Sequence, residues 1–275
     1  MKKYDNTIEY HELLMTYNDT SKSLNYNLPD GYHYSFYKPG DEKDWAQIHI
    51  ESGEFMSIEH GLKHFHDFYD SFIDELPKRC FFVENDKNEK VGTATISLLQ
   101  NSEYGYDAVV DWFAIKRSYQ GKHLAKPMVV YFIKLAHDLG HSKLLLHTQT
   151  TSWLAANLYL DCGFEPFKVE NDIKGWQILN TITNNPKLKQ YGKVSQEKIY
   201  SPLALGIVKE LNKLYSDDYD FAFWDKKGRN DIEVNHHGQL DKYQYYFIDN
   251  QLILENSLRK ENDWCRFHFS ITIFS

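Results

Sequence analysis

Residues 109–125 read VVDWFAIKRSYQGKHLA, and this stretch carries the clearest structural signal in the chain. Its first seven residues are apolar except for Asp111, which is typical of a buried strand. The following residues form a short basic turn that contains Gly121 and leads directly into a helix. The first turn of a helix has backbone N–H groups without helical partners, and the helix dipole makes that end positive. The stretch therefore predicts a binding site for a phosphate-bearing ligand.

Composition narrows the class of protein. The chain has 275 residues, 42% of them hydrophobic and 16% aromatic, which is enough for a packed core. Its formal net charge is −8, which argues against a general nucleic-acid binder. Three widely spaced cysteines argue against a disulfide framework. Together with the sparse cysteines, the polar N-terminus and the lack of a long apolar segment predict a cytoplasmic protein without a membrane partner, and the acidic charge predicts no nucleic-acid partner.

Outside residues 109–125, some segments have apolar residues at helical spacing and others have them at the two-residue spacing of strands. This pattern predicts a mixed α/β (α+β) fold, in which a sheet is flanked by helices. The expected helices lie in residues 1–28 (one short helix, then a connector), from 41 to 52, from 57 to Pro77, and over 124–139 and 153–162. The expected strands lie over 32–37, 80–84, 91–98, 109–115 and 144–148, from Phe164 onward, and over 176–183.

Composition shifts near Asn184, and residues 185–193 have the polar character of a linker. Beyond them the pattern predicts an amphipathic helix over 202–215 and then strands over 219–224, 231–235, 243–248, 252–255 and 264–274. These observations predict three parts: an N-terminal extension (1–30), a main domain (31–185) and a small C-terminal α+β domain (195–275).

Two motifs within residues 31–183 resemble the GNAT superfamily of acetyl-CoA-dependent N-acetyltransferases. The first is the turn that starts at Gln120 and ends at Ala125, which matches the superfamily's phosphate motif except at His123, where the family usually has glycine. The second is the helix of residues 153–162, which carries Tyr159 and ends in Gly163-Phe164. The resemblance implies a mixed sheet with two splayed strands, and acetyl-CoA as cosubstrate without a metal.

The resemblance also implies roles for individual residues. The residues expected to hold the cofactor are the strand end Phe113, Ala114 and Ile115, the turn Gln120, Gly121, Lys122, His123, Leu124 and Ala125, and Asn157 on the later helix. Tyr159 matches the family tyrosine that protonates the departing CoA thiolate, which is chemically reasonable for a phenol beside a thiol. The alternative is that Tyr159 is a core aromatic residue.

The family often places a carboxylate base on the strand that precedes the phosphate turn. Asp111 is the first candidate, because it lies two residues before Phe113 and is therefore expected on the same face of the strand. Glu54, in the loop between the first two helices, is the second candidate. The alternatives are a structural hydrogen-bond partner for Asp111 and a solvated loop carboxylate for Glu54. Residues 147–150 follow the expected splayed strand. They are expected either to line the active-site cleft between the splayed strands or to cap the next helix.

The resulting hypothesis is an N-acetyltransferase that transfers an acetyl group from acetyl-CoA to a primary amine by direct attack. The acidic chain favours a cationic acceptor, such as a polyamine, an aminoglycoside or a lysine side chain of a peptide. The alternative is a GNAT-fold module that binds acyl-CoA or regulates without catalysis. In either case the C-terminal module is a candidate surface for a homodimer or a protein partner, and its aromatic residues Trp224, Tyr245 and Trp264 form either that surface or the module's own core.

Overall fold

The structure is a computed structural model that describes most of the first 200 residues and the strands that follow. The described residues are 8–22, 24–55, 57–99, 105–195, 198–200, five helical residues between 205 and 212, and the strands beyond residue 218. They form two compact units, and residues 12–176 make up the first. The second contains residues 8–11 and the described residues from 177 onward.

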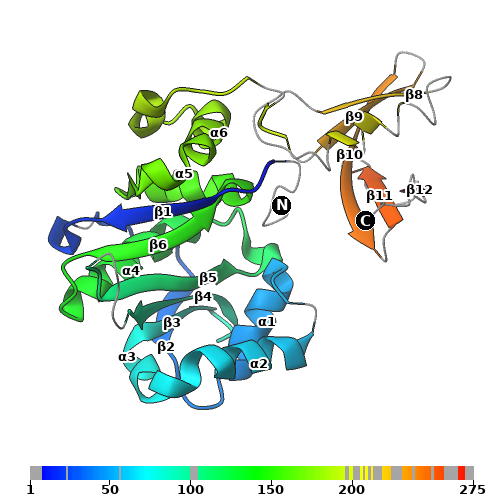
Figure 1. Ribbon diagram of the computed structural model, residues 1–275. Coiled ribbons are helices and arrows are strands. Elements are labelled where there is room, and N and C mark those ends of the chain that lie inside the picture. The colour runs from blue at the N-terminus through cyan, green and yellow to red at the C-terminus, as the bar shows by residue number, and fades with distance from the viewer. Residues whose placement is uncertain are drawn as a thin grey trace. The chain divides into compact units, whose positions relative to one another are not determined.

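A seven-stranded mixed sheet forms the centre of the first unit (Figure 1), with strand order β2-β3-β4-β5-β6-β1-β7. The strands are β1 (Glu12–Tyr17), β2 (Tyr32–Phe36), β3 (Cys80–Asn85), β4 (Lys90–Leu98), β5 (Ala108–Ile115), β6 (Leu144–Gln149) and β7 (Glu165–Phe167). The helices are α1 (Glu42–Ser52), α2 (Ile58–Tyr69), α3 (Leu76–Arg79), α4 (Ala125–Asp138), α5 (Trp153–Asp161) and α6 (Ile173–Thr183), the last of which continues into the second unit. Within the described part of the chain, short 3-10 helices connect them: η1 (Thr20–Lys22), η2 (Asp70–Glu75), η3 (Arg117–Tyr119), η4 (Thr150–Ser152), η5 (Val169–Asn171) and η6 (Pro186–Tyr191).

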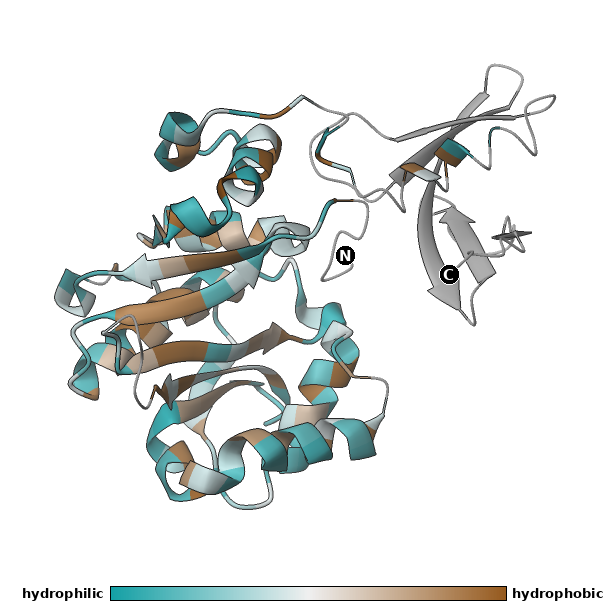
Figure 2. Ribbon diagram, in the orientation of Figure 1, coloured by the Kyte–Doolittle hydropathy of each residue, from teal (hydrophilic) through white to brown (hydrophobic). Residues whose placement is uncertain are grey.

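The two faces of the sheet are covered by different helices. On one face, α1 and α2 contribute Trp45, Ile48 and Phe65 to a core that also contains Phe82 of β3. On the other face, Tyr131 of α4 contacts Phe81, the neighbour of Phe82. Figure 2 shows that β5 is largely hydrophobic and that β6 is hydrophobic over its first half, as expected where strands are covered on both faces.

The N-terminal strand corrects one sequence prediction. Residues 12–17 form β1 rather than a short helix, and β1 lies between β6 and β7, antiparallel to both (Figure 1). Leu13 and Met15 are completely buried there. The apolar residues of this segment are therefore part of the central sheet, and their partners come from residues 144–149 and 165–167, more than 100 positions later.

Two other elements also differ from the sequence prediction. Residues 176–183 form part of α6 rather than a strand, and Trp176, Leu179 and Ile182, which recur at helical spacing, are each buried. Pro77 does not end the helix that Ser57 caps. That helix ends at Tyr69, and Pro77 instead lies in the first turn of α3, where its missing N–H costs no hydrogen bond.

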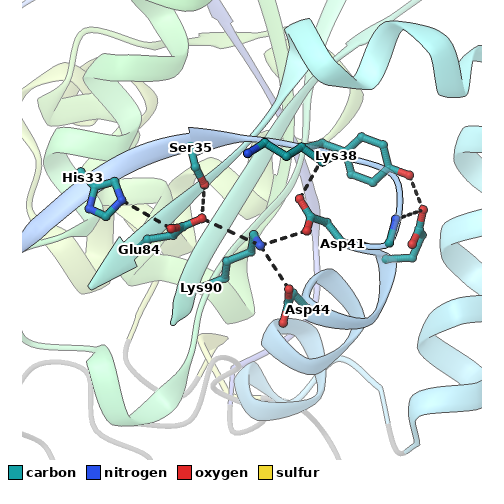
Figure 3. A network of polar contacts seen from close by, with 10 residues as sticks. His33, Ser35, Lys38, Asp41, Asp44, Glu84 and Lys90 are labelled. Atoms are coloured by element: carbon teal, nitrogen blue, oxygen red, sulfur yellow. Dashed lines mark hydrogen bonds and ion pairs between the residues drawn. The ribbon is translucent and has the colours of Figure 1, made fainter. Parts of the chain in front are cut away.

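A network of ions fixes the N-terminus of α1 against the sheet (Figure 3). Lys90 Nζ of β4 lies 2.9 Å from Asp41 Oδ1 and 3.2 Å from Asp44 Oδ2. It also lies 3.8 Å from Glu84 of β3, which accepts a hydrogen bond from Ser35 of β2. Because the start of α1, β3 and β4 meet at one ammonium group, and β2 joins them through Ser35 and Glu84, the N-terminus of α1 is held against these strands.

The second unit begins with a packed segment rather than an extended linker. Leu188 of η6 is completely buried, and the side chains of Gln177 and Asn180 donate hydrogen bonds to the carbonyls of Tyr191 and Gly192. The strands β8 (Tyr219–Phe223), β9 (Asp231–His236), β10 (Gln239–Ile248), β11 (Gln251–Asn256) and β12 (Arg266–Phe269) form an antiparallel sheet in the order β12-β11-β10-β9-β8. The sequence prediction of a C-terminal meander is confirmed. Trp224, Trp264 and the side chain of Tyr245 lie outside the described residues, and the division into residues 1–30, 31–185 and 195–275 stays a prediction.

Candidate functional site

A β-bulge in β5 shapes the site. Thr93 of β4 pairs with Ala114, and Thr95 pairs with Asp111, so two steps along β4 correspond to three steps along β5. The extra residue in β5 places Trp112 at φ = +53°, in the left-handed region. This conformation is rare for a bulky side chain, and such residues concentrate at functional sites.

The bulge changes which side chains share a face. Asp111 pairs with Thr95, whose hydroxyl accepts a hydrogen bond of 2.9 Å from Tyr69 of α2, so Asp111 lies on the face covered by α1 and α2. The ring of Phe113 instead contacts Phe132 of α4 and Tyr159 of α5. The prediction that Asp111 and Phe113 share a face is therefore wrong, because the extra residue breaks the alternation of the strand.

The sheet opens beside the bulge. The parallel pairing of β5 with β6 is confined to Val109 and Val110, opposite Leu145 and Leu146. Beyond these residues the two strands splay, as the resemblance implied. The gap forms a cleft of about 590 Å³ that is lined by residues from both faces of the sheet. These include Ser52, Glu54, Asp111 and Trp112 on the α1/α2 side and Gln120, Gly121, Leu154, Leu158 and Tyr159 on the α4/α5 side.

The turn before α4 has the backbone expected of an anion site. Gly121 and His123 have φ values of +79° and +61°. Leu124, the N-cap residue of α4, makes no capping hydrogen bond with its side chain, so that side chain satisfies none of the N–H groups in the first turn of the helix. Gln120 donates from Nε2 to the carbonyl of Ile115 at 3.2 Å, which ties the turn to the end of β5. His123 therefore occupies a left-handed position that glycine would adopt without strain, and its N–H group is retained.

The structure brings most of the candidate residues to one cleft. Those that line it are Glu54, Asp111, Phe113, Ala114, Ile115, Gln120, Gly121, His123, Leu124, Ala125 and Tyr159. Two candidates do not line it. Lys122 places Nζ 4.5 Å from the centre of the Tyr119 ring, and Asn157 donates to Asp161 at 3.3 Å. From the splayed strand and the residues after it, His147, Thr148 and Gln149 line the cleft but Thr150 does not.

Tyr159 lies on the α4/α5 side of the cleft. Its ring is buried against Phe113, with 6.1 Å between ring centres, and against Phe164 at 5.9 Å. These contacts fix the ring, so the position of the hydroxyl depends on packing within the core. Tyr159 therefore packs in the core and also lines the cleft, and its role as a proton donor stays a prediction.

Asp111 and Glu54 lie on the opposite side of the cleft. Burial raises the pKa of Asp111 above its ordinary value, and Ser97 of β4 and His147 of β6 partly oppose that shift. A carboxyl group whose pKa moves toward neutrality is suited to exchange a proton with a ligand. Glu54 follows Gly53, the left-handed C-cap of α1, and its N–H donates to the carbonyl of His49 at 2.8 Å.

Several residues of the cleft carry no signal in the sequence. Trp112 is the main example, because its bulge exists only relative to the pairing partners on β4. Leu154 and Leu158 could have been found, since they lie one helical turn apart on the helix that carries Tyr159.

Among the described residues, no cluster of three or more His, Cys, Asp or Glu side chains could hold a metal ion. In the same part of the chain, none of the helices combines the length and the apolar character that crossing a membrane requires.

Comparison with known proteins matches part of the first unit to one family model and finds similar solved structures. Residues 44–164 match the model of a family described as the acetyltransferase (GNAT) family. The chain matches none of the curated proteins. Among solved structures it is similar to a GCN5-related N-acetyltransferase from Sphaerobacter thermophilus, with 15% identity and a TM-score of 0.48 over 58% of this chain and 49% of that chain. An acetyltransferase of the GNAT family from Colwellia psychrerythraea gives 15% identity and a TM-score of 0.45, over 59% and 55% of the two chains.

A third similar structure is a glucosamine-6-phosphate N-acetyltransferase from Arabidopsis thaliana, with 12% identity and a TM-score of 0.36 over 48% of this chain and 90% of that chain. The match to the Sphaerobacter and Colwellia proteins spans about half of the length of each.

Proposed function

Since this chain carries a GNAT acetyltransferase domain over residues 44–164, we propose that it is an N-acetyltransferase that transfers the acetyl group of acetyl-CoA to a primary amine. Membership of the family implies acyl transfer from an acyl-CoA. The observation that supports the finer proposal is the cleft through the splayed sheet. It places the phosphate turn and Tyr159 on one side and the carboxylates of Asp111 and Glu54 on the other.

The residues of the cleft suit a CoA thioester. The left-handed turn at Gly121 and His123 and the start of α4 offer backbone N–H groups to a pyrophosphate. The edge of β5 from Asp111 to Ile115 does not pair with β6, so it is available to the amide groups of a pantetheine arm. Leu154 and Leu158 of α5 supply apolar surface along the same path.

The chemistry then divides between the two faces of the sheet. A neutral amine arrives from the α1/α2 side and attacks the thioester carbonyl, whose oxygen is polarised by backbone N–H groups near Ala114 or Ile115. Asp111 accepts the proton that the amine loses, directly or through a water molecule. Glu54 is the second candidate for this role. The hydroxyl of Tyr159 donates a proton to the sulfur as the C–S bond breaks.

The test measures acetyl-CoA binding by titration and then thiol release in the presence of a panel of primary amines. Tyr159→Phe is expected to lower kcat by about 100-fold with little change in the Kd for acetyl-CoA. Tyr131→Phe is the matched control, because Tyr131 stacks on Tyr34 of β2 and does not line the cleft. Wild-type turnover in Tyr159→Phe would remove Tyr159 from the mechanism, and binding without turnover by the wild type would favour a non-catalytic module.

A further inference from the structure

The indole of Trp112 forms an aromatic wall on the α1/α2 side of the cleft. Trp112 is partly buried and lines the cleft directly. Its ring centre lies between 5.2 and 6.3 Å from those of five other rings on the first two helices and the loop between them: Trp45, His49, Phe55, His64 and Phe68. These contacts hold the indole in place before any ligand binds.

The bulge brings this wall beside the candidate base. In a regular strand the side chains of residues 111 and 112 would point to opposite faces of the sheet. Because Trp112 is the extra residue, at φ = +53°, both it and Asp111 lie on the face covered by α1 and α2. A ligand whose nitrogen approaches Asp111 therefore has the rest of its body against the indole.

The charged side chains of the cleft favour a cationic ligand on the α1/α2 side. Glu54 and Asp111 are the carboxylates among its described lining residues, and both lie on the α1/α2 side. Lys126 is the one Lys or Arg side chain among the same residues, and it lies in the first turn of α4, on the cofactor side. A phosphate or carboxylate on an acceptor at the α1/α2 side would thus meet two carboxylates, and none of the described lining residues on that side is a lysine or arginine.

We propose, on the basis of the acetyl transfer proposed above, that the acceptor is a cationic primary amine carried on an aromatic or other apolar body, and that Trp112 determines this specificity. The apolar body stacks on the indole, which also attracts the ammonium group through its ring face before deprotonation. The strained conformation of Trp112 is consistent with this role, since strain at a bulky residue persists only where the surroundings enforce it.

The test compares kcat/KM for 2-phenylethylamine and for glucosamine 6-phosphate, with thiol release as the readout. The wild type is expected to prefer 2-phenylethylamine by at least about tenfold, and Trp112→Gly to raise its KM about tenfold, with the KM for acetyl-CoA unchanged. Glycine adopts the left-handed conformation readily, so this variant keeps the bulge. Trp112→Phe keeps an aromatic face and is expected to have an intermediate KM. Tyr131→Leu, which removes a stacked ring away from the cleft, controls for loss of packing and is expected to leave both KM values unchanged.

The outcomes separate this inference from the proposed function. Efficient acetylation of glucosamine 6-phosphate, or an unchanged KM for 2-phenylethylamine in Trp112→Gly and Trp112→Phe, would overturn the role of Trp112 while leaving acetyl transfer intact. Absence of thiol release with every amine tested would overturn the proposed function itself.

Discussion

The glycine of the Gly163-Phe164 motif can be tested for a packing role that the sequence does not reveal. Gly163 has φ = +111°, and a Cβ atom built on it would lie 2.8 Å from Cε2 of Tyr17, in the N-terminal strand β1. Gly40 has a similar φ of +105°, but a Cβ atom there would meet nothing within 4 Å. The two positions share the backbone strain of a left-handed residue and differ in the steric clash.

The expected magnitudes follow from this difference. Gly40→Ala introduces backbone strain only, partly offset by the lower entropy of the unfolded chain, and is expected to lower the free energy of unfolding by about 1 kcal/mol. Gly163→Ala adds overpacking against a buried aromatic ring, which costs about 1–3 kcal/mol more. The total expected loss for Gly163→Ala is therefore about 2–4 kcal/mol.

Equilibrium unfolding in urea, followed by tryptophan fluorescence, measures both losses. A double-mutant cycle with Tyr17→Leu sharpens the test, because removing the ring edge should reduce the cost of Gly163→Ala to roughly that of Gly40→Ala, about 1 kcal/mol. Equal costs for the two alanine variants, or a cost at Gly163 that is independent of Tyr17, would refute the proposed contact between β1 and the motif.

Two further predictions concern the cleft. Burial raises the pKa of Asp111 in the folded protein above its value in the unfolded chain. At pH values between these two pKa values the folded state binds more protons than the unfolded state, so the free energy of unfolding falls as the pH rises through this range. Asp111→Asn should therefore raise Tm at pH 7 but not near pH 3, and should lower kcat/KM by about 100-fold with loss of the acidic limb of its pH profile. A destabilised or fully active variant would contradict this reasoning. His123→Gly should leave the Kd for acetyl-CoA within about threefold of the wild type by calorimetry, because the backbone N–H is kept and a left-handed strain of about 1 kcal/mol is relieved. A tenfold loss of affinity would instead show that the imidazole binds the cosubstrate.

Much of the candidate site could be predicted because its signals are local. The turn at residues 120–125 and the helix that carries Tyr159 each depend on residues within one or two helical turns of each other, so their local pattern is visible in the sequence. The same holds for the five strands after residue 218, whose alternating apolar pattern needs no partner to be recognised.

The position of β1 could not be predicted in this way. The apolar residues of 12–17 fit a short helix as well as a strand when read alone, and only pairing with residues 144–149 and 165–167 decides between them. Helix α6 is the opposite error, because the sequence pattern predicts a strand where the structure has a helix. The apolar residues of 176–183 also fit a strand when read alone, but Trp176, Leu179 and Ile182 recur at helical spacing and are each buried in the folded helix.

By itself, the sequence determined that a strand leads through a glycine-containing turn into a helix and that a later helix ends in Gly163-Phe164, because these are local backbone and periodicity effects. Only the tertiary structure decided that Asp111 and Trp112 lie together on one face while Phe113 faces α4 and α5. The physical reason is that a bulge is an extra residue relative to a partner strand, and the register of that pairing with β4 is a property of the folded sheet.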